Sequence, residues 1–272
     1  MKLLKFLITA CFVFIFGMSF AFSQSVSDSF KKASKGDSEA MYILGLAYLT
    51  GTGGVEQNER MAGHWFEESA KKGNVDAMSK LGTMYLNNRN YSEAIKLFKK
   101  ASSKGDIASI YSLGLYYQFI EKDNEQAFKY YKKAAEKGFG KAMAKLAWCY
   151  YYNQGVLDRN HCKLSLEWGR KAAEANNSEG MYFLSVYYSN NDCKETDYNK
   201  AQEWFNKAVE NRNAKACYIA IYQTDNIEKR KQLCMTCFDA LQRGDTDYSL
   251  SESENMKMNV VEEFEQIGGF DE

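Results

Sequence analysis

Proline is absent from this 272-residue chain, and histidine occurs only twice, as His64 and His161. Because proline interrupts helix interiors, its absence is compatible with a succession of unbroken helices. The two histidines lie far apart in the sequence, so neither a nucleophile–histidine pair nor a histidine-based metal site has a second member. We therefore expect no catalytic residue, no metal site and no cofactor, with His64 partly packed beside Trp65 and His161 exposed at the start of a helix.

Net charge is also lacking, since 35 basic residues balance 35 acidic ones. No basic stripe is visible, which argues against a nucleic-acid partner. The charges are nevertheless unevenly distributed, because residues 245–272 contain nine acidic residues and a single lysine. Opposite charge could hold this acidic tail against the basic remainder of the chain, and a disordered tail is the alternative.

A short pattern recurs along the chain: a Leu is followed by a small residue and, four positions after the Leu, by a Tyr. Successive copies are 32 to 38 residues apart, a period typical of stacked repeat arrays. Apolar residues within each copy recur at intervals of three and four, which predicts pairs of amphipathic helices. The copies have Leu44, Leu81, Leu113, Leu146 and Leu184 in the Leu position, and a degenerate sixth has Ala220 there.

Glycine or asparagine follows the second predicted helix of most copies. A left-handed backbone often ends a helix at such a position, where a residue without a Cβ has no steric cost. Arg212 falls at this position in the copy after Asn176, so we expect that turn to shift onto Asn211 or Asn213. The regular positions are Gly73, Gly105, Gly138 and Asn176.

The best-preserved copy, residues 40–73, resembles the signature of the Sel-1-like repeat family, which is related to the tetratricopeptide repeat. The resemblance extends over roughly residues 25–222. It implies an all-α fold, an α/α superhelical solenoid of about five to six helix-turn-helix repeats with a capping helix at each end. The signature residues are Ala40, Leu44, Gly45, Tyr48, Gly51, Gly53, Val55, Ala62, Trp65, Ala70 and Gly73.

We divide the chain into a leader (residues 1–23), the solenoid (24–222) and a C-terminal helical cap with the acidic tail (223–272). A lone helix over 25–36, which buries Phe30 and Ala33, begins the solenoid. The sixth copy supplies helices over 214–222 and 226–243. Ser251 and Glu254 match a capping box that would begin a terminal helix over 252–266. The apolar face of that helix consists of Met256, Val260, Phe264 and Ile267.

The leader has the features of a secretory signal peptide. Lys2 and Lys5 precede an apolar run, and Ala21 and Ser23 are the small residues that a signal peptidase selects, so we expect cleavage before Gln24. The mature chain would then be periplasmic or secreted by a bacterium and would have no membrane span. An uncleaved anchor is one alternative. A lipoprotein is another, but Cys11 comes too early in the apolar run to favour it.

Six cysteines remain beyond the leader, and an even number in an exported protein favours disulfides. Cys149 ends one predicted helix and Cys162 begins its partner, so these two residues are candidates for a bridge. Cys193 lies in a loop beside the copy that carries Cys217. Cys234 and Cys237 could form a strained local bridge or a redox-active pair, and reduced thiols are a further alternative. The disulfide pattern of cysteine-rich family members does not match this spacing.

Two short motifs suggest an alternative function. Ser29 and Lys32 match the S-x-x-K motif of penicillin-recognising enzymes, and cysteine-rich relatives of this repeat family have been linked to β-lactam binding or hydrolysis. No companion K-T-G or S-D-N motif follows. A β-lactam-binding or cell-wall-active enzyme is therefore the alternative. The glycines of residues 51–54 lack the lysine and the preceding strand of a phosphate-binding loop.

The first helix of each pair lines the concave side in tetratricopeptide-like stacks, and its aromatic residues form a candidate groove. Rigid aromatic side chains suit an extended peptide or a partner helix. Ordinary packing between repeats is the alternative, and Trp148 and Tyr151 depart most from the common repeat pattern. We predict a non-enzymatic, monomeric scaffold that binds a protein or peptide partner. The predicted partner-binding residues are Tyr42, Leu46, Tyr111, Leu115, Trp148, Tyr151 and Tyr182.

Overall fold

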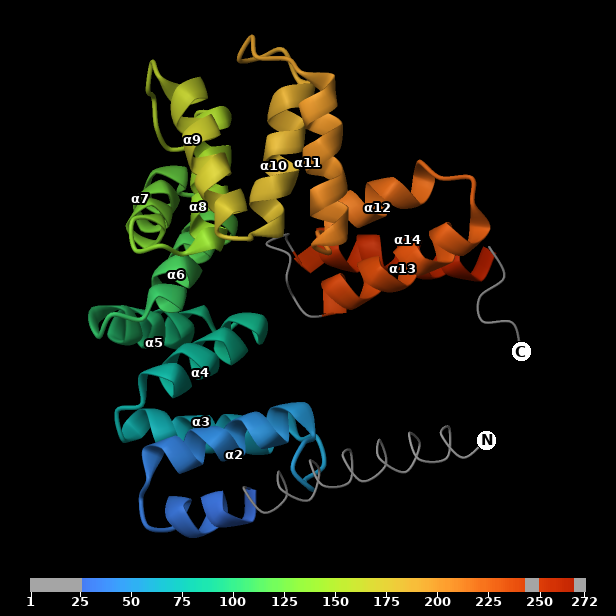
Figure 1. Cartoon of the computed structure of the whole chain (residues 1–272). Helices are drawn as coiled ribbons and strands as arrows, with labels where there is room; N and C mark the ends of the chain where they lie inside the picture. Colours follow the sequence, from blue (N-terminus) through green and yellow to red (C-terminus); the bar gives the residue numbers. More distant parts are fainter. Residues whose placement is uncertain (1–25, 243–249, 267–272) are drawn as a thin grey trace, which may run out of the picture. The chain divides into compact units, whose positions relative to one another are not determined.

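The computed structural model describes residues 26–242 and 250–266, without the side chains of 250–253, 264 and 265. Every regular element within these residues is a helix, which confirms the predicted all-α fold. A first helix over 26–33 precedes the labelled helices of Figure 1. These are α2 (Ser38–Thr50), α3 (Glu59–Lys71), α4 (Val75–Asn87), α5 (Tyr91–Ser103), α6 (Ile107–Phe119), α7 (Asn124–Ala135), α8 (Gly140–Tyr151), α9 (His161–Glu174), α10 (Ser178–Ser189), α11 (Tyr198–Glu210), α12 (Ala214–Tyr222), α13 (Ile227–Gln242) and α14 (Leu250–Gln266).

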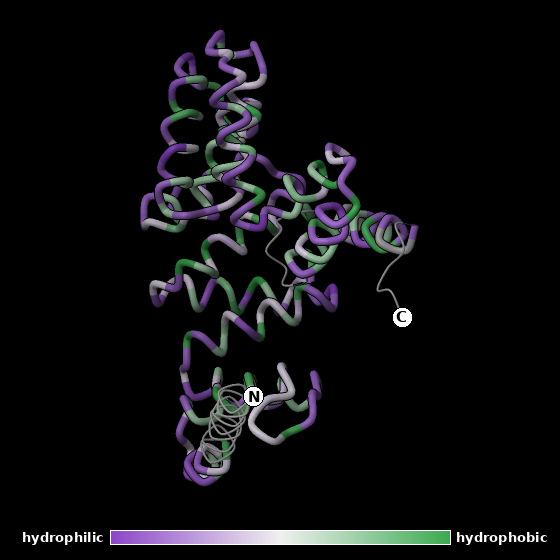
Figure 2. Tube along the Cα trace, turned by 45° about the vertical axis from the view of Figure 1, so that its right-hand side comes forward, coloured by the Kyte–Doolittle hydropathy of each residue, from purple (hydrophilic) through white to green (hydrophobic). Residues whose placement is uncertain are grey.

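The chain divides into two compact units, and the division falls within α6, between Ser112 and Leu113. In the first unit α2 packs on α3 and α4 packs on α5, while α3 also contacts α4. In the second unit the pairs are α8 with α9, α10 with α11 and α12 with α13, and α9 also contacts α10. The predicted helix-turn-helix repeats are therefore present. Figure 2 shows hydrophobic and hydrophilic positions alternating along the helices, as expected when each helix buries one face.

Glycine on the first helix of a pair makes room for an aromatic ring on the second. A Cβ atom added to Gly45 would lie 2.5 Å from the ring of Phe66, and one added to Gly82 would lie 2.7 Å from Phe98. Gly114 and Tyr131 repeat this contact in the second unit, at 2.5 Å. These rings are fully buried. The small residue after each repeat Leu therefore permits close helix packing.

The fourth repeat reverses this size relationship. Its second helix, α9, has Gly169 in the aromatic position, and the ring of Phe183 from α10 fills the space. A Cβ atom added to Gly169 would lie 2.4 Å from that ring. Phe183 is fully buried as a result. The aromatic side chain that completes the fourth pair thus comes from the fifth.

The turns between repeats use left-handed residues, as predicted. Gly73 and Gly105 have φ of 97°, and Asn176 has φ of 58°. The predicted shift at Arg212 is wrong, because Arg212 itself is left-handed with φ of 58°. The following residue, Asn213, is needed as the N-cap of α12, where its side-chain oxygen accepts from the backbone N–H of Ala216. That cap fixes the register of the turn.

The two ends of the array are helical. At the start, Ala33 is buried and the ring of Phe30 lies edge-on to Trp65 at 5.9 Å. At the other end, α14 packs on α13, and its Val260 is buried in the cluster that contains Leu233. Arg230 of α13 also pairs with Glu263 of α14 at 3.4 Å. A terminal helix is therefore present, and its first residue lies two positions before the predicted start.

Several predictions concern residues that the structure does not describe. The leader over 1–23, with Cys11, lies outside the described residues, as do Ile267 and the side chain of Ser251. Among the helices that are described, none has both the length and the apolar character needed to cross a membrane.

Candidate functional site

The predicted partner-binding residues are distributed over both units and differ in burial. Tyr42, Leu46 and Tyr111 belong to the first unit, and the other four belong to the second. Tyr42 is half-buried with its ring centroid 5.8 Å from that of Phe66, and burial raises its pKa with help from Asp76 and Glu39. The half-buried residues also include Leu46, Leu115 and Trp148, whereas Tyr111, Tyr151 and Tyr182 are buried.

The structure brings Trp148, Tyr151 and Tyr182 together in the second unit. Ring centroids of Tyr151 and Tyr182 lie 6.2 and 6.3 Å from that of Trp148. The fully buried ring of Phe183 meets Trp148 edge-on at 4.8 Å. Tyr151 and Tyr182 therefore mainly support the packing, and Trp148 is the member of this group that remains partly exposed.

Tyr152 is an accessible aromatic residue that the sequence analysis did not include. Its ring stacks on Trp148 with centroids 5.5 Å apart and planes only 6° from parallel. Tyr152 is 56% exposed. It follows Trp148 by four positions, one turn further along α8, so the same periodicity that placed Trp148 on the candidate groove could have found it. We call these two residues the aromatic pair.

Glu179 fixes the orientation of Trp148 and links three helix pairs. The indole Nε1 of Trp148 donates to Glu179 Oε1 at 3.1 Å. The side-chain amide of Asn213 donates to the other oxygen, Oε2, at 3.0 Å. In the first unit Asn74 donates to Glu39 Oε2 in the same way, at 3.0 Å. The Glu–Asn contact is thus a repeated feature, and the bond from Trp148 is an addition in the second unit.

Tyr151 is held by a loop that follows α10. Its hydroxyl donates to Asp192 Oδ2 at 2.8 Å, and the amide of Asn190 donates to that hydroxyl at 3.3 Å. Burial raises the pKa of Tyr151 to about 12; the bond from Asn190 opposes this rise and the Asp192 carboxylate adds to it. The Tyr151 hydroxyl therefore stays protonated at neutral pH and can act as a donor.

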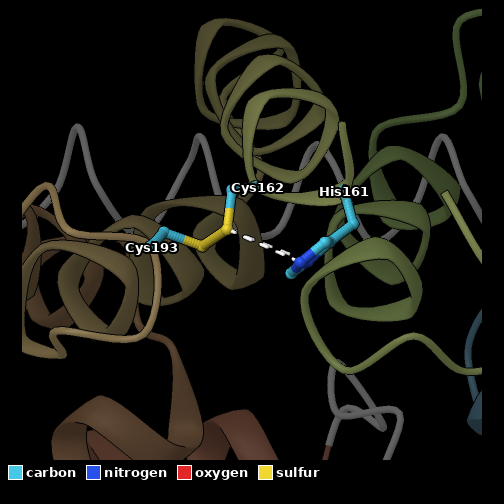
Figure 3. A group of neighbouring side chains, drawn as sticks. All are labelled: His161, Cys162 and Cys193. Atoms are coloured by element: carbon cyan, nitrogen blue, oxygen red, sulfur yellow. Dashed lines mark hydrogen bonds between the residues drawn. A yellow bond between two sulfur atoms is a disulfide. The ribbon is translucent and has the colours of Figure 1, made fainter. Parts of the chain in front are cut away.

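The disulfide joins Cys162 to Cys193, with Cα atoms 5.5 Å apart, so the candidate bridge between Cys149 and Cys162 is not formed. Cys162 is the second residue of α9, and its side chain reaches forward to the loop after α10 (Figure 3). Cys149, its predicted partner, instead points into the core, and Cys217 is likewise a free, buried thiol. Sequence spacing alone does not specify this pairing.

Four cysteines are free and buried: Cys149, Cys217, Cys234 and Cys237. Burial raises the pKa of Cys149 and of Cys237 to about 12. It raises the pKa of Cys217 and of Cys234 to about 11. The Cys237 thiol donates to the carbonyl oxygen of Ala214 at 3.3 Å, which fits a reduced residue. No bridge joins Cys234 to Cys237, and burial disfavours the thiolate that a redox-active pair would need.

His161 lies beside the disulfide, with its Nδ1 3.8 Å from Cys162 Sγ (Figure 3). It is half-buried, which corrects the prediction of an exposed side chain. His161, Cys162 and Cys193 would form a plausible set of metal ligands, since their ligand atoms lie within 4.8 Å of one another. Both sulfur atoms are bonded to each other, however, so only the imidazole has a lone pair suited to a metal.

The remaining chemical candidates are His64, the S-x-x-K residues and the glycine turn. His64 is exposed, which corrects the prediction of partial packing, and only the edge of its ring approaches Trp65. Ser29 of the S-x-x-K motif is buried, whereas Lys32 of the same helix is exposed. Gly51 has a left-handed backbone and belongs to the turn between α2 and α3.

Comparison with protein families identifies the repeats directly. The model of the Sel1 repeat matches five consecutive segments, residues 38–74, 75–106, 107–139, 140–177 and 178–213. Their phase agrees with the five copies that the Leu and Tyr positions define.

Curated relatives are longer proteins with different roles. The chain is 32% identical over 215 residues to the ERAD-associated E3 ubiquitin-protein ligase component HRD3B of Arabidopsis thaliana, which covers 72% of this chain and 34% of that protein. It is 31% identical over 134 residues to an F-box protein of the same plant, covering 48% of this chain and 38% of the relative. The chain thus spans little more than a third of these relatives.

Solved structures agree with the fold. A Sel1 repeat protein from Oxalobacter formigenes superposes with a TM-score of 0.64 at 28% identity, covering 70% of this chain and 79% of that one. The protective antigen c5321 of uropathogenic Escherichia coli gives 0.60 at 22% identity, covering 90% and 57%. Five consecutive segments match the Sel1 repeat, each segment forms a helix pair, and a solved Sel1 repeat protein has a similar fold. The chain therefore belongs to the Sel1 repeat family.

Proposed function

We propose that this chain is an exported, non-enzymatic scaffold that binds a protein or peptide partner on the first-helix surface of its second unit. The observation that carries the proposal is the aromatic pair. Tyr152 is 56% exposed and stacks on Trp148, which is itself anchored by Glu179. Aromatic side chains that are fixed before binding lose little conformational entropy in a complex and often dominate its free energy.

The chemistry of the pair indicates the kind of partner. Its flat apolar surface suits a segment that presents a bulky aliphatic or aromatic side chain, while Tyr152 also offers a hydroxyl group. Tyr151 and Tyr182, two further predicted groove residues of this unit, pack beside the pair and contribute rigidity. We propose that the scaffold acts as a monomer.

Membership of the family supports binding but does not name the partner. The HRD3B relative is described as a component of a ligase, so its repeats occur within an assembly. The present chain matches about a third of that protein, and the partner is expected to differ.

Export is supported by the leader and by the disulfide. Disulfides persist in oxidising compartments, and Cys162–Cys193 is formed. Sequencing the N-terminus of the chain recovered from the cell-envelope or culture fraction tests this point. We expect Gln24 as the first residue. A chain that begins at Met1, or one that carries lipid at Cys11, would contradict the proposal.

The binding proposal is tested by capture from a solubilised envelope extract, followed by calorimetry with each purified candidate. Tyr152→Ala is the informative variant because it removes an exposed ring without opening the core. Tyr198→Ala is the matched control, since Tyr198 is 73% exposed on α11 of the same unit.

We expect Tyr152→Ala to weaken binding by about 2 kcal/mol, the scale of an interface hot spot, and Tyr198→Ala to leave it unchanged. Equal affinity of the parent and of Tyr152→Ala would show that the aromatic pair is not the binding site.

A further inference from the structure

We propose that the Cys162–Cys193 disulfide is a thiol–disulfide exchange site for a dithiol reductant, and that its redox state controls the loop supporting the aromatic pair. The exchange chemistry stands on the cysteine cluster alone. Only the consequence for partner affinity rests on the proposed function.

The disulfide ties a loop to a helix start. Cys193 lies in the loop over 190–197 between α10 and α11, and Cys162 lies in the first turn of α9. Most of this loop is exposed, and both cysteines are half-buried rather than enclosed. Reactive disulfides need this kind of access, since the attacking thiolate must approach along the S–S axis. The loop is otherwise held by a few hydrogen bonds, among them that from the Asp197 N–H to the Tyr188 carbonyl at 2.9 Å.

His161 makes the two sulfur atoms inequivalent. Its ring nitrogens lie 3.8 and 3.9 Å from Cys162 Sγ. A ring N–H this close to Cys162 Sγ can stabilise the negative charge that develops there, so Cys162 is the better leaving group and Cys193, on the exposed loop, is the atom attacked.

The exchange is a balanced two-electron reaction. A thiolate of the dithiol attacks Cys193 Sγ and forms a mixed disulfide, the S–S bond breaks, and its electron pair leaves on Cys162 Sγ beside His161. Cys162 then takes up a proton. The second thiol of the reductant attacks the mixed disulfide, which releases Cys193 as a thiol and closes the disulfide of the reductant. Two electrons and two protons pass from the dithiol to the protein.

The other described cysteines do not compete. Cys149, Cys217, Cys234 and Cys237 are buried as thiols. Thiolates, not thiols, carry out exchange, and burial in apolar surroundings suppresses both thiolate formation and access. The described part of the chain therefore holds one reducible pair.

The loop connects this chemistry to the aromatic pair. Asp192, which precedes Cys193 in the sequence, accepts a hydrogen bond from the Tyr151 hydroxyl at 2.8 Å. The ring of Tyr151 lies 5.0 Å from Tyr152 and 6.2 Å from Trp148, between centroids. Reduction removes the covalent restraint on the loop that holds Tyr151, and so loosens the support beneath the pair.

The first experiment measures reduction of the full chain by dithiothreitol, with thiols trapped over time and located by peptide mass spectrometry. We expect trapping at Cys162 and Cys193 in the native protein and none at the four buried cysteines. His161→Gln should slow reduction about threefold or more, because it removes the ring that stabilises the leaving thiolate. His64→Gln, at the other and exposed histidine, is the matched control. Reduction that occurs only with global unfolding would overturn the exchange site, and an unaltered rate in His161→Gln would overturn the role of the imidazole.

The second experiment measures amide hydrogen exchange of the oxidised and the reduced full chain, with Cys162→Ser/Cys193→Ser as a permanently open form. We expect exchange over residues 188–198 and 148–153 to become at least about tenfold faster on reduction, and exchange over α2–α5 to stay the same. Unchanged exchange in both segments would overturn control of the loop. This measurement needs no partner. If reduction changes the loop but Tyr152→Ala does not change partner affinity, the proposed binding site is refuted and the exchange site stands.

Discussion

The indole Nε1 of Trp148 donates to Glu179 Oε1 at 3.1 Å, and the two residues belong to successive helix pairs. The second oxygen of the same carboxylate accepts from Asn213, the N-cap of α12. One side chain at the start of α10 therefore holds an aromatic residue of the pair before it and the first turn of the pair after it. In an array whose stability is a sum over neighbouring interfaces, this bridge couples three repeats.

Replacing Glu179 tests that coupling. Glu179→Ala removes the acceptor of two donors and should destabilise the chain by about 1–3 kcal/mol, the cost of leaving part-buried polar groups unsatisfied. Glu203→Ala is the matched control, because Glu203 makes only an exposed ion pair with Lys207 and should change stability by about 0–1 kcal/mol. Urea unfolding measures both, and equal midpoints for the two variants would refute the coupling.

Two glycine-to-alanine changes in the first unit, at Gly82 and at Gly63, should have opposite effects on stability. A Cβ atom at residue 82 would lie 2.7 Å from the Phe98 ring, so Gly82→Ala should cost about 1–3 kcal/mol through overpacking. Gly63 is also inside a helix, but its nearest neighbour is the flexible end of Met84 at 3.4 Å. Gly63→Ala should therefore stabilise by about 0.5–1 kcal/mol. Thermal unfolding checks the sign, and a stabilised Gly82→Ala would contradict the packing argument.

Arg212 has a left-handed backbone that costs a residue with a Cβ about 1–2 kcal/mol. Arg212→Gly relieves that strain but loses the exposed ion pair with Asp239, so we expect a net gain of up to about 1 kcal/mol. Arg212→Ala loses the same ion pair and keeps the strain, and it should not be more stable than the parent. The two variants compared by urea unfolding separate the contributions, and equal stability would show that the backbone is not strained.

Stability should fall at high pH because of buried thiols. Burial raises the pKa of Cys149 to about 12, whereas an unfolded thiol titrates near about 8.5. The unfolded state therefore releases this proton first. The contribution of Cys149 to stability is complete below the unfolded pKa and is lost as pH rises toward the folded value. We expect urea midpoints to decrease between about pH 9 and 11, with a shallower slope in Cys149→Ala. Parallel slopes in the two proteins would exclude Cys149 as a cause.

The periodicity of the sequence was sufficient to predict the fold. The helix expected over 214–222 occurs as Ala214–Tyr222, and Gly73 and Asn176 have the backbone predicted for helix ends. These features depend on local pattern, such as a Leu and a Tyr one turn apart or a residue that tolerates a positive φ, and local pattern is visible in a sequence.

Features that depend on how one helix is rotated against the next were not predictable. Hairpin geometry made Cys149 and Cys162 candidates for a bridge, but Cys162 is bonded to Cys193 instead. Tyr151 and Tyr152 are adjacent, yet Tyr151 is buried and its hydroxyl is held by Asp192 of the loop after α10, whereas Tyr152 is exposed. The sequence therefore predicted the buried aromatic residues of the candidate site, and Tyr152, the exposed ring beside them, was missed.

The contact between Gly169 of the fourth repeat and Phe183 of the fifth limits which repeats can be duplicated or deleted singly. In the first three repeats the glycine and its aromatic ring belong to the same pair, so duplication or deletion of one of these repeats keeps this contact intact. The fourth and fifth repeats share one such contact and form a two-repeat module. Excising residues 140–177 would leave the ring of Phe183 without its recess, and excising 178–213 would leave the recess empty. Recombination that moves a single early repeat should therefore keep this contact, whereas the fourth and fifth repeats must move together to keep theirs.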